Sequence, residues 1–194
     1  MHDCIYTPYC TYKQCDLACP NRAEVNCWFK RCRLDMSNNC LHTNIRNIEK
    51  AEDLLSNKYG ETVWFPTDNP SDASDTICYV AICKYGKGTA LGNGIYNLDF
   101  ARFIDMIKES WNTHFETDNL IQMRVWSLSA NYLVISNLDY VRFQDFESQT
   151  LLRLLNDRRD YTKTTVVVTS KEPLVGSGNF FPRLTSLLKG VKSN

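Results

Sequence analysis

The order of apolar and polar segments after residue 43 predicts strands that alternate with helices. Apolar runs of strand length occur in "ETVWF", "GIYNL", "NYLVISNL" and "KTTVVVTS". Between them, apolar residues recur at helical spacing in "NIRNIEKAEDLLSNKY", "TICYVAICKYG", "FARFIDMIKESW" and "DFESQTLLRLLNDRRDY". Strands that are joined by helical crossovers pair in parallel. We therefore expect an α/β domain with a parallel sheet over residues 43–194.

Residues that flank these segments indicate where several elements begin and end. Gly60 is placed to stop the first helix, and Pro66 to end the strand "ETVWF". The polar stretch "PTDNPSDASD" is expected to form a loop, so that the next helix begins near Ser74 or Asp75. Asp99 is placed to cap the helix that follows "GIYNL".

Residues 1–42 differ in composition from the rest of the chain. All but two of the nine cysteines lie there, the exceptions being Cys78 and Cys83. The odd total, and an N-terminus "MHDCIYTPYC" without the basic and apolar parts of a secretory leader, favour reduced thiols and a metal over disulfides. Because the segment has few aliphatic residues to bury, we expect a small module that a metal holds together.

Charge and hydropathy narrow the class of partners. The 22 basic residues equal the 22 acidic ones, so any attraction to nucleic acid has to come from a local patch. No apolar run reaches the length of a membrane-spanning helix. We therefore expect a cytoplasmic protein without a membrane partner.

Four cysteines of the N-terminal module have the spacing of a zinc site. They are Cys4, Cys10, Cys15 and Cys19, in "CIYTPYCTYKQCDLAC". Short gaps let the backbone turn around one tetrahedral ion, so zinc is the expected cofactor and free thiols are the alternative. The spacing resembles that of CCCH zinc fingers, with Cys19 in place of the usual final histidine.

Several residues near these cysteines are candidates for contacts with nucleic acid or a partner. CCCH fingers in several families bind single-stranded RNA, and the resemblance implies base stacking on Tyr6, Tyr9 and Tyr12. Tyrosines that merely cover the metal are the alternative. The strongest local basic cluster is "FKRCR", with Lys30, Arg31 and Arg33, although a solvated helix face explains it equally well.

The remaining N-terminal cysteines indicate a metal site less clearly. Cys27 is interpreted as a small core residue. A second metal site that uses Cys32, Cys40, His2 or His42 remains an alternative.

The segment from residue 131 to residue 170 carries a family resemblance. "NYLVISNLDYVRFQDFESQTLLRLLNDRRDYTKTTVVVTS" resembles the Walker B strand, following helix and sensor strand of the AAA+ ATPases, most closely replicative-helicase loaders of the DnaC/DnaI type. In that family the strand ends in acidic residues, the helix in an Asp-Arg-Arg-like group and the next strand in Thr-Ser or Thr-Asn. The resemblance extends more weakly back to "ETVWF", over residues 45–190; an unrelated parallel α/β domain is the alternative.

The residues that would bind and hydrolyse ATP depart from the family pattern. The stretch after "ETVWF" has neither the glycines nor the lysine of a phosphate loop. "KYGKGTALGNG" contains glycines and a lysine but is predicted to follow a helix, so we interpret it as a turn. Ser136 and Asn137 stand where the family carries the Walker B carboxylates. Arg183 matches an arginine that often faces a neighbouring subunit's nucleotide, with an ordinary surface arginine as the alternative.

These patterns predict a zinc module followed by an AAA+-like α/β domain that does not catalyse ATP hydrolysis. By resemblance, the expected role is that of a helicase-loader-like protein in DNA replication that contacts a replicative helicase or a competent AAA+ loader. An origin in a phage or another mobile element would be consistent with such a shortened copy. The alternatives are a zinc-dependent regulator that binds single-stranded nucleic acid, and an ATPase with a cryptic site.

Overall fold

A computed structural model describes residues 60–85, 94–172 and 174–190, together with Cys32, Ala51, Leu54 and Leu55. The predicted zinc ligands, the three tyrosines and the basic cluster lie outside the described residues. The same is true of the turn "GKGTALGN" and of the boundary at residue 42.

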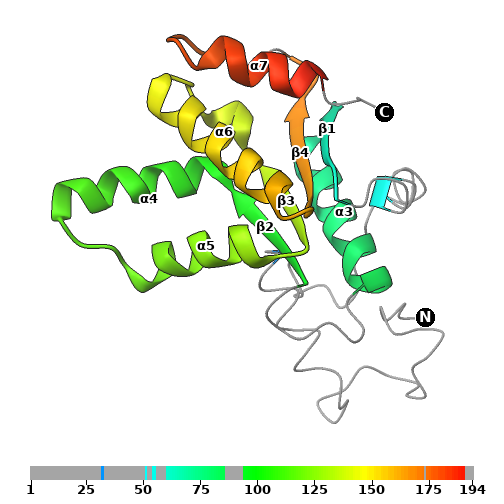
Figure 1. Ribbon diagram of the computed structural model, residues 1–194. Coiled ribbons are helices and arrows are strands. Elements are labelled where there is room, and N and C mark those ends of the chain that lie inside the picture. The colour runs from blue at the N-terminus through cyan, green and yellow to red at the C-terminus, as the bar shows by residue number, and fades with distance from the viewer. Residues whose placement is uncertain are drawn as a thin grey trace.

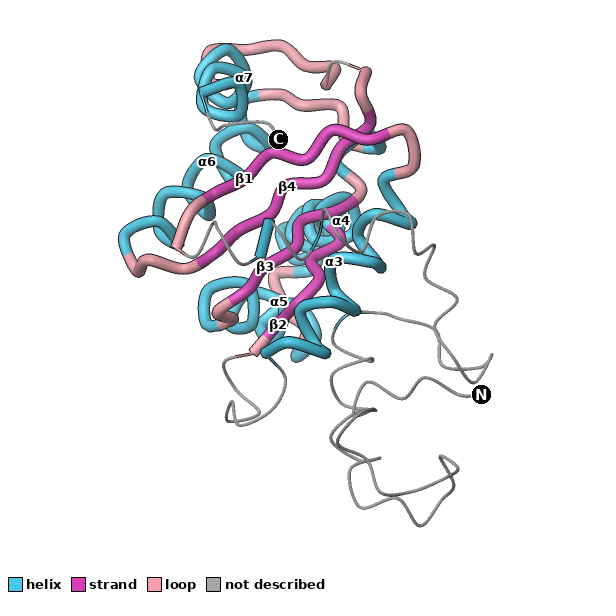
Figure 2. Tube along the Cα trace, turned by 90° about the vertical axis from the view of Figure 1, so that its right-hand side faces the viewer, coloured by secondary structure: helices cyan, strands magenta, loops and turns pink. Residues whose placement is uncertain are grey.

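Four parallel strands form the sheet. They are β1 (Thr62–Thr67), β2 (Ile95–Asp99), β3 (Tyr132–Ser136) and β4 (Thr164–Ser170). Their order is β1-β4-β3-β2, and Figure 2 shows them side by side in this order. Val134 of β3 pairs with Asn97 of β2 and with Val166 of β4. The predicted parallel α/β class is therefore confirmed.

Helices cover both faces of this sheet. They are α3 (Pro70–Tyr85), α4 (Phe100–Thr113), α5 (Asp118–Ser129), α6 (Asp145–Asp160) and α7 (Phe181–Gly190), with a short 3₁₀ helix η2 (Leu138–Tyr140) after β3. Helix α3 lies against one face, and α6 and α7 lie on the other (Figure 1). Helices α4 and α5 form a pair that reaches out beyond the sheet.

Alternating strand residues build two separate cores. Val134 and Val166 face the α3 side, where Ala51, Leu54 and Leu55 are also buried. These three residues are helical and buried, as predicted for apolar residues of the first helix; the rest of that helix lies outside the described residues. The next residues along the strands, among them Leu133, Ile135 and Val167, face the larger core under α4 to α7. This two-sided burial explains why the strands are almost continuously apolar.

Two predicted boundaries were wrong. Helix α3 begins at Pro70 and not near Ser74 or Asp75, because Asn69 caps it and proline suits the first helical position. Strand β1 runs through Pro66 to Thr67, since it pairs only with β4 among the described strands and Pro66 can direct its missing donor away from that pairing. The expected loop therefore shrinks to two residues.

Other predicted elements agree with the structure. The strands "GIYNL", "NYLVISNL" and "KTTVVVTS" correspond to β2, β3 and β4, and the helix after residue 144 to α6. The Asp99 side chain accepts a hydrogen bond from the Arg102 amide at 3.0 Å, as expected of a helix cap. Gly60 has a φ of 77°, in the left-handed region that glycine adopts readily, and the end of the helix that it was predicted to stop lies outside the described residues. None of the helices in the described ranges has the length and apolarity needed to cross a bilayer.

Helix α5 ends against two cations. Arg158 of α6 is fully buried and donates through Nη1 to the carbonyl oxygens of Ser127 and Ala130, both at 2.8 Å. Lys163 donates through Nζ to the carbonyl oxygens of Leu128 at 2.7 Å and Ser129 at 3.0 Å. Positive charge at a helix C-terminus is favourable, because the last carbonyl groups have no partner within the helix.

Candidate functional site

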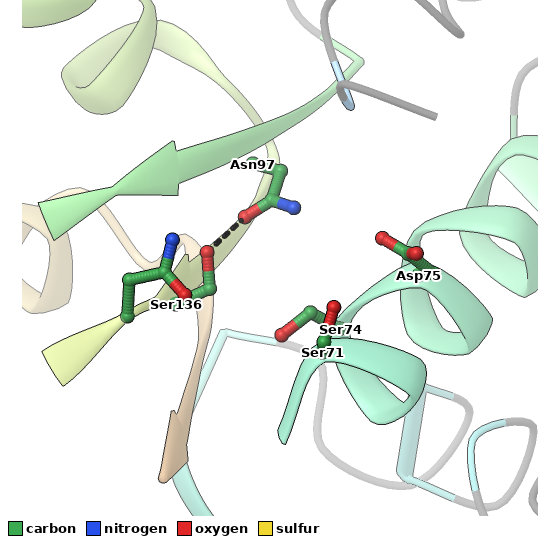
Figure 3. A pocket seen from close by; sticks show the side chains of 6 residues that line it. Ser71, Ser74, Asp75, Asn97 and Ser136 are labelled. Carbon is green, nitrogen blue, oxygen red and sulfur yellow. Dashed lines mark hydrogen bonds between the residues drawn. The ribbon is translucent and has the colours of Figure 1, made fainter. Parts of the chain in front are cut away.

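The candidate site is a small polar pocket at the carboxyl edge of the sheet. It has a volume of about 180 Å³. Its lining residues are Ser71, Ser74 and Asp75 of α3, Asn97 of β2, Ser136 of β3, and Asn137. Figure 3 shows the α3 side chains across from Asn97 and Ser136. Ligands of parallel α/β proteins bind at this edge, beyond the strand ends.

Ser136 and Asn137 lie where the sequence predicted them, at the end of β3. Ser136 is buried, and its hydroxyl donates to Oδ1 of Asn97 at 2.9 Å, with the Leu98 carbonyl oxygen as a more distant acceptor at 3.5 Å. Asn137 follows in the left-handed conformation, with φ 62°, which asparagine tolerates better than most residues. The position of the family's carboxylates thus holds an amide and a hydroxyl that is hydrogen-bonded within the protein.

The connection from β1 to α3 is short. Only Asp68 and Asn69 separate the strand from the helix. Oδ1 of Asn69 accepts from the Asp72 amide at 3.2 Å, and its carbonyl oxygen accepts from the Ala73 amide at 3.1 Å. The Asp72 amide, one of the donors that an anion would use at a helix N-terminus, is therefore already occupied, whereas the Ala73 bond is the first bond within the helix itself.

The acids around this edge do not form one cluster. Asp75 lines the pocket, whereas Asp68 is exposed and pairs with Lys171 at 2.6 Å. Asp139 of η2 accepts from the amide and the hydroxyl of Ser170, at 2.9 Å and 2.8 Å. Within the described ranges, no group of three or more His, Cys, Asp or Glu residues is arranged to hold a metal ion.

Arg183 is distant in sequence from the pocket residues and does not line the pocket. It lies exposed on α7, with its guanidinium 5.8 Å from the centre of the Phe180 ring. The structure thus brings together Ser136, Asn137 and Asp75, but it adds neither Arg183 nor Asp68 to them.

Sequence reasoning missed Asn97 and the role of Asp139. Asn97 is the third of the five residues of β2, "IYNLD", and a polar residue inside a mostly apolar strand was the available signal. The role of Asp139, three residues beyond Ser136, could not be predicted, because only the fold shows that η2 places its carboxylate beside Ser170 at the end of β4.

Comparison with known proteins identifies the fold. No family model matches the sequence, and no curated protein matches it. A solved structure of a DNA replication initiation factor superposes with a TM-score of 0.56 at 12% identity, over 78% of this chain and 45% of that chain. The replication initiator DnaA bound to AMPPCP and single-stranded DNA gives 0.55 at 12%, covering 77% and 45%. AMPPCP-bound DnaA from Aquifex aeolicus gives 0.55 at 11%, covering 79% and 46%.

The present chain thus spans less than half the length of these solved structures. At such low identity the likeness concerns the fold, and not the ligands or the activity. The described α/β domain, a parallel sheet with helices on both faces, therefore shares its fold with these solved structures of replication initiators.

Proposed function

We propose that this protein is a non-catalytic, helicase-loader-like component of DNA replication that acts through protein contacts. Its expected partner is a replicative helicase or a competent AAA+ loader. The likeness to replication initiators supports a role in DNA replication, because three of these structures share the fold over more than three quarters of the chain.

One observation carries the non-catalytic part of the proposal: β1 and α3 are joined by Asp68 and Asn69 alone. A phosphate loop needs about eight residues, with glycines whose amides surround the phosphates and a lysine that reaches them. The Asn69 cap and the nearby Asp72 instead make this helix N-terminus unfavourable for a triphosphate. Ser136 and Asn137 also lack the charge that would hold magnesium.

Calorimetry with ATP and magnesium tests this part. We expect no one-site binding in the micromolar range. A double variant, Ser136→Asp with Asn137→Glu, should still fail to turn over ATP, because it leaves the connection from β1 to α3 unchanged. One micromolar site per chain in the unmodified protein would contradict the proposal and favour an ATPase with a cryptic site.

We further propose that Cys4, Cys10, Cys15 and Cys19 hold one zinc ion. This proposal rests on their spacing, because the four residues lie outside the described part of the chain. Zinc-bound cysteines are deprotonated, and such binding couples to folding of a small module. Deletion of residues 1–42 should abolish binding to the main protein partner, whereas a truncated chain with unchanged partner binding would show that the module is not the contact.

A gel-shift titration separates this role from that of a nucleic-acid-binding regulator. A protein that acts through protein contacts should bind single strands weakly. Tight binding whose affinity falls steeply with salt would favour the regulator, since salt dependence reports the number of phosphate contacts.

A further inference from the structure

Helix α5 carries a row of exposed apolar side chains on the side that faces away from the core. They are Ile121, Val125 and Leu128. Residues that are three and four positions apart lie on one face of a helix. Figure 1 shows α5 below α4, at the margin of the α/β domain. Single exposed apolar residues are normal in proteins, whereas a contiguous group marks a surface that another molecule covers.

An exposed aromatic side chain lies at each end of this row. Phe115 lies in the link between α4 and α5. Tyr161 lies near the end of α5, because its ring centre is 5.7 Å from Nζ of Lys163, which also donates to the carbonyl oxygen of Leu128 at 2.7 Å. Five of the eight large hydrophobic side chains that are exposed in the described part of the chain are thus gathered here. We call them the α5 strip: Phe115, Ile121, Val125, Leu128 and Tyr161.

The charges at the two ends of α5 have opposite signs. Asp118 is exposed at the first position of the helix, and Lys163 lies beside its last carbonyl groups. Between these ends α5 has one charged side chain, Arg124, which pairs with Glu116 at 2.7 Å. Nucleic acid binds mainly through cations that contact its phosphates. An apolar row whose own arginine is already paired therefore suits a protein surface better than it suits nucleic acid.

The α5 strip is complementary to itself when two copies lie antiparallel. Val125 is close to the midpoint between Ile121 and Leu128. A twofold axis near Val125 therefore places Ile121 of one copy against Leu128 of the other. The same arrangement brings Asp118 of one copy to the helix end that carries Lys163 in the other, so that opposite charges meet at both ends.

We propose that the α5 strip is the interface at which a second copy of this chain binds, as an antiparallel twofold dimer. Closed twofold dimers use the same patch on both copies and are the commonest homo-oligomers. The pocket stays accessible in such a dimer, because α3 packs on the opposite face of the sheet from α5. An interface of one helix and two aromatic side chains is small, so we expect a dissociation constant on the order of 10 μM.

Sedimentation equilibrium of the full chain measures this association. With rising concentration, the mass should increase from 22.4 kDa toward twice that value. Val125→Asp should raise the dissociation constant at least about 100-fold, because two carboxylates would meet near the axis at a place that the dimer shields from water. Val175→Asp is the matched control, since Val175 is 70% exposed, against 55% for Val125, and lies outside the strip. It should leave the dissociation constant unchanged.

An exchange of charges tests the antiparallel arrangement. Asp118→Lys and Lys163→Glu should each raise the dissociation constant about 10-fold when measured alone, because like charges then face each other at both ends. An equimolar mixture of the two variants should dimerise as well as the unmodified protein does, since both ends of the mixed dimer again join opposite charges. Urea denaturation of each variant shows whether it is folded.

Three results would overturn the proposal. They are an unmodified chain that stays monomeric at about 300 μM, far above the expected dissociation constant, a dimer that Val125→Asp leaves intact, and a mixture of folded charge variants that does not dimerise. A monomeric chain that loses binding to single-stranded DNA or to a helicase in Val125→Asp would assign the strip to that partner instead. The sedimentation measurements need neither ATP nor a partner, so their failure is distinguishable from failure of the proposed function.

Discussion

Replacement of Arg158 by methionine is expected to lower the free energy of unfolding by about 3 to 5 kcal/mol, the cost typical of removing one side of a buried charged interaction. Arg158 is fully buried, and its guanidinium makes four hydrogen bonds. The acceptors are Oγ1 of Thr165 at 2.7 Å, the carbonyl oxygens of Ser127 and Ala130 at 2.8 Å, and the carbonyl oxygen of Thr164 at 2.6 Å.

The expected magnitude follows from two opposing contributions. Hydrogen bonds to a charged group contribute about 1.5 kcal/mol each at the low end, so four give about 6 kcal/mol. Burial opposes this, and it lowers the pKa of Arg158 to about 9, which still leaves the group charged at neutral pH. Among the described contacts of Arg158 none is with a carboxylate, so the dipoles of three carbonyl groups and the Thr165 hydroxyl offset the desolvation of the guanidinium.

Urea denaturation followed by tryptophan fluorescence measures the change. Trp126 on α5 is a suitable probe, because its ring lies 5.5 Å from that of Tyr96. Arg158→Lys should be more stable than Arg158→Met but less stable than the unmodified protein, since an ammonium group cannot place its donors as the planar guanidinium does. Arg159→Met is the matched control, because Arg159 is exposed. A methionine variant as stable as the unmodified protein would refute the argument, because it would mean that burial of the charge cancels the four hydrogen bonds.

Three further predictions concern single sites. The Lys108 ammonium, at 2.7 Å, and the amides of Gln144 and Glu147 lower the pKa of the Glu147 carboxyl below its ordinary value of 4.5, although burial alone would raise it. The ionised Glu147 carboxylate therefore stabilises the folded state above pH 4.5, and this stabilisation is lost as the pH falls toward the lowered pKa. Glu147→Gln should flatten the acid side of a curve of stability against pH, and it should lower the free energy of unfolding by about 1 kcal/mol at pH 7. Gly178→Ala should lower the free energy of unfolding by about 2 kcal/mol or more, measured by urea denaturation, because a Cβ atom would collide with Asp145 where φ is 97°. Cys15→Ser should reduce the zinc content of protein purified without added metal, measured by elemental analysis, and full retention of zinc would contradict the proposed ligand set.

Apolar periodicity predicted the sheet well, but it could not reveal α5. The strands are buried on both faces, so their apolar runs are unambiguous. Helix α5 buries Leu120 and Met123, yet Ile121, Val125 and Leu128 are exposed on its other side. With apolar residues all around the helix, no stripe at helical spacing marks it in the sequence.

The candidate site could be predicted only in part, for a related reason. Ser136 and Asn137 were located because the family resemblance marks the end of β3. Asn97 could not be paired with Ser136, since only the sheet order shows that the two strands that carry them are neighbours. Likewise, the sequence "NDRRD" contains two neighbouring arginines, and only the packing of α6 shows that Arg158 is buried whereas Arg159 is exposed.

The two-residue link between β1 and α3 has a consequence for how such a protein can evolve. Point substitutions could return acids to the end of β3, but a phosphate loop of about eight residues requires an insertion. That insertion would remove Asn69 from its capping position before any benefit from ATP could appear. Point substitutions alone therefore cannot give this chain a phosphate loop, and the first step toward one costs the helix cap. An engineer who wants an ATP-controlled version should transplant a complete strand, loop and helix from an active ATPase.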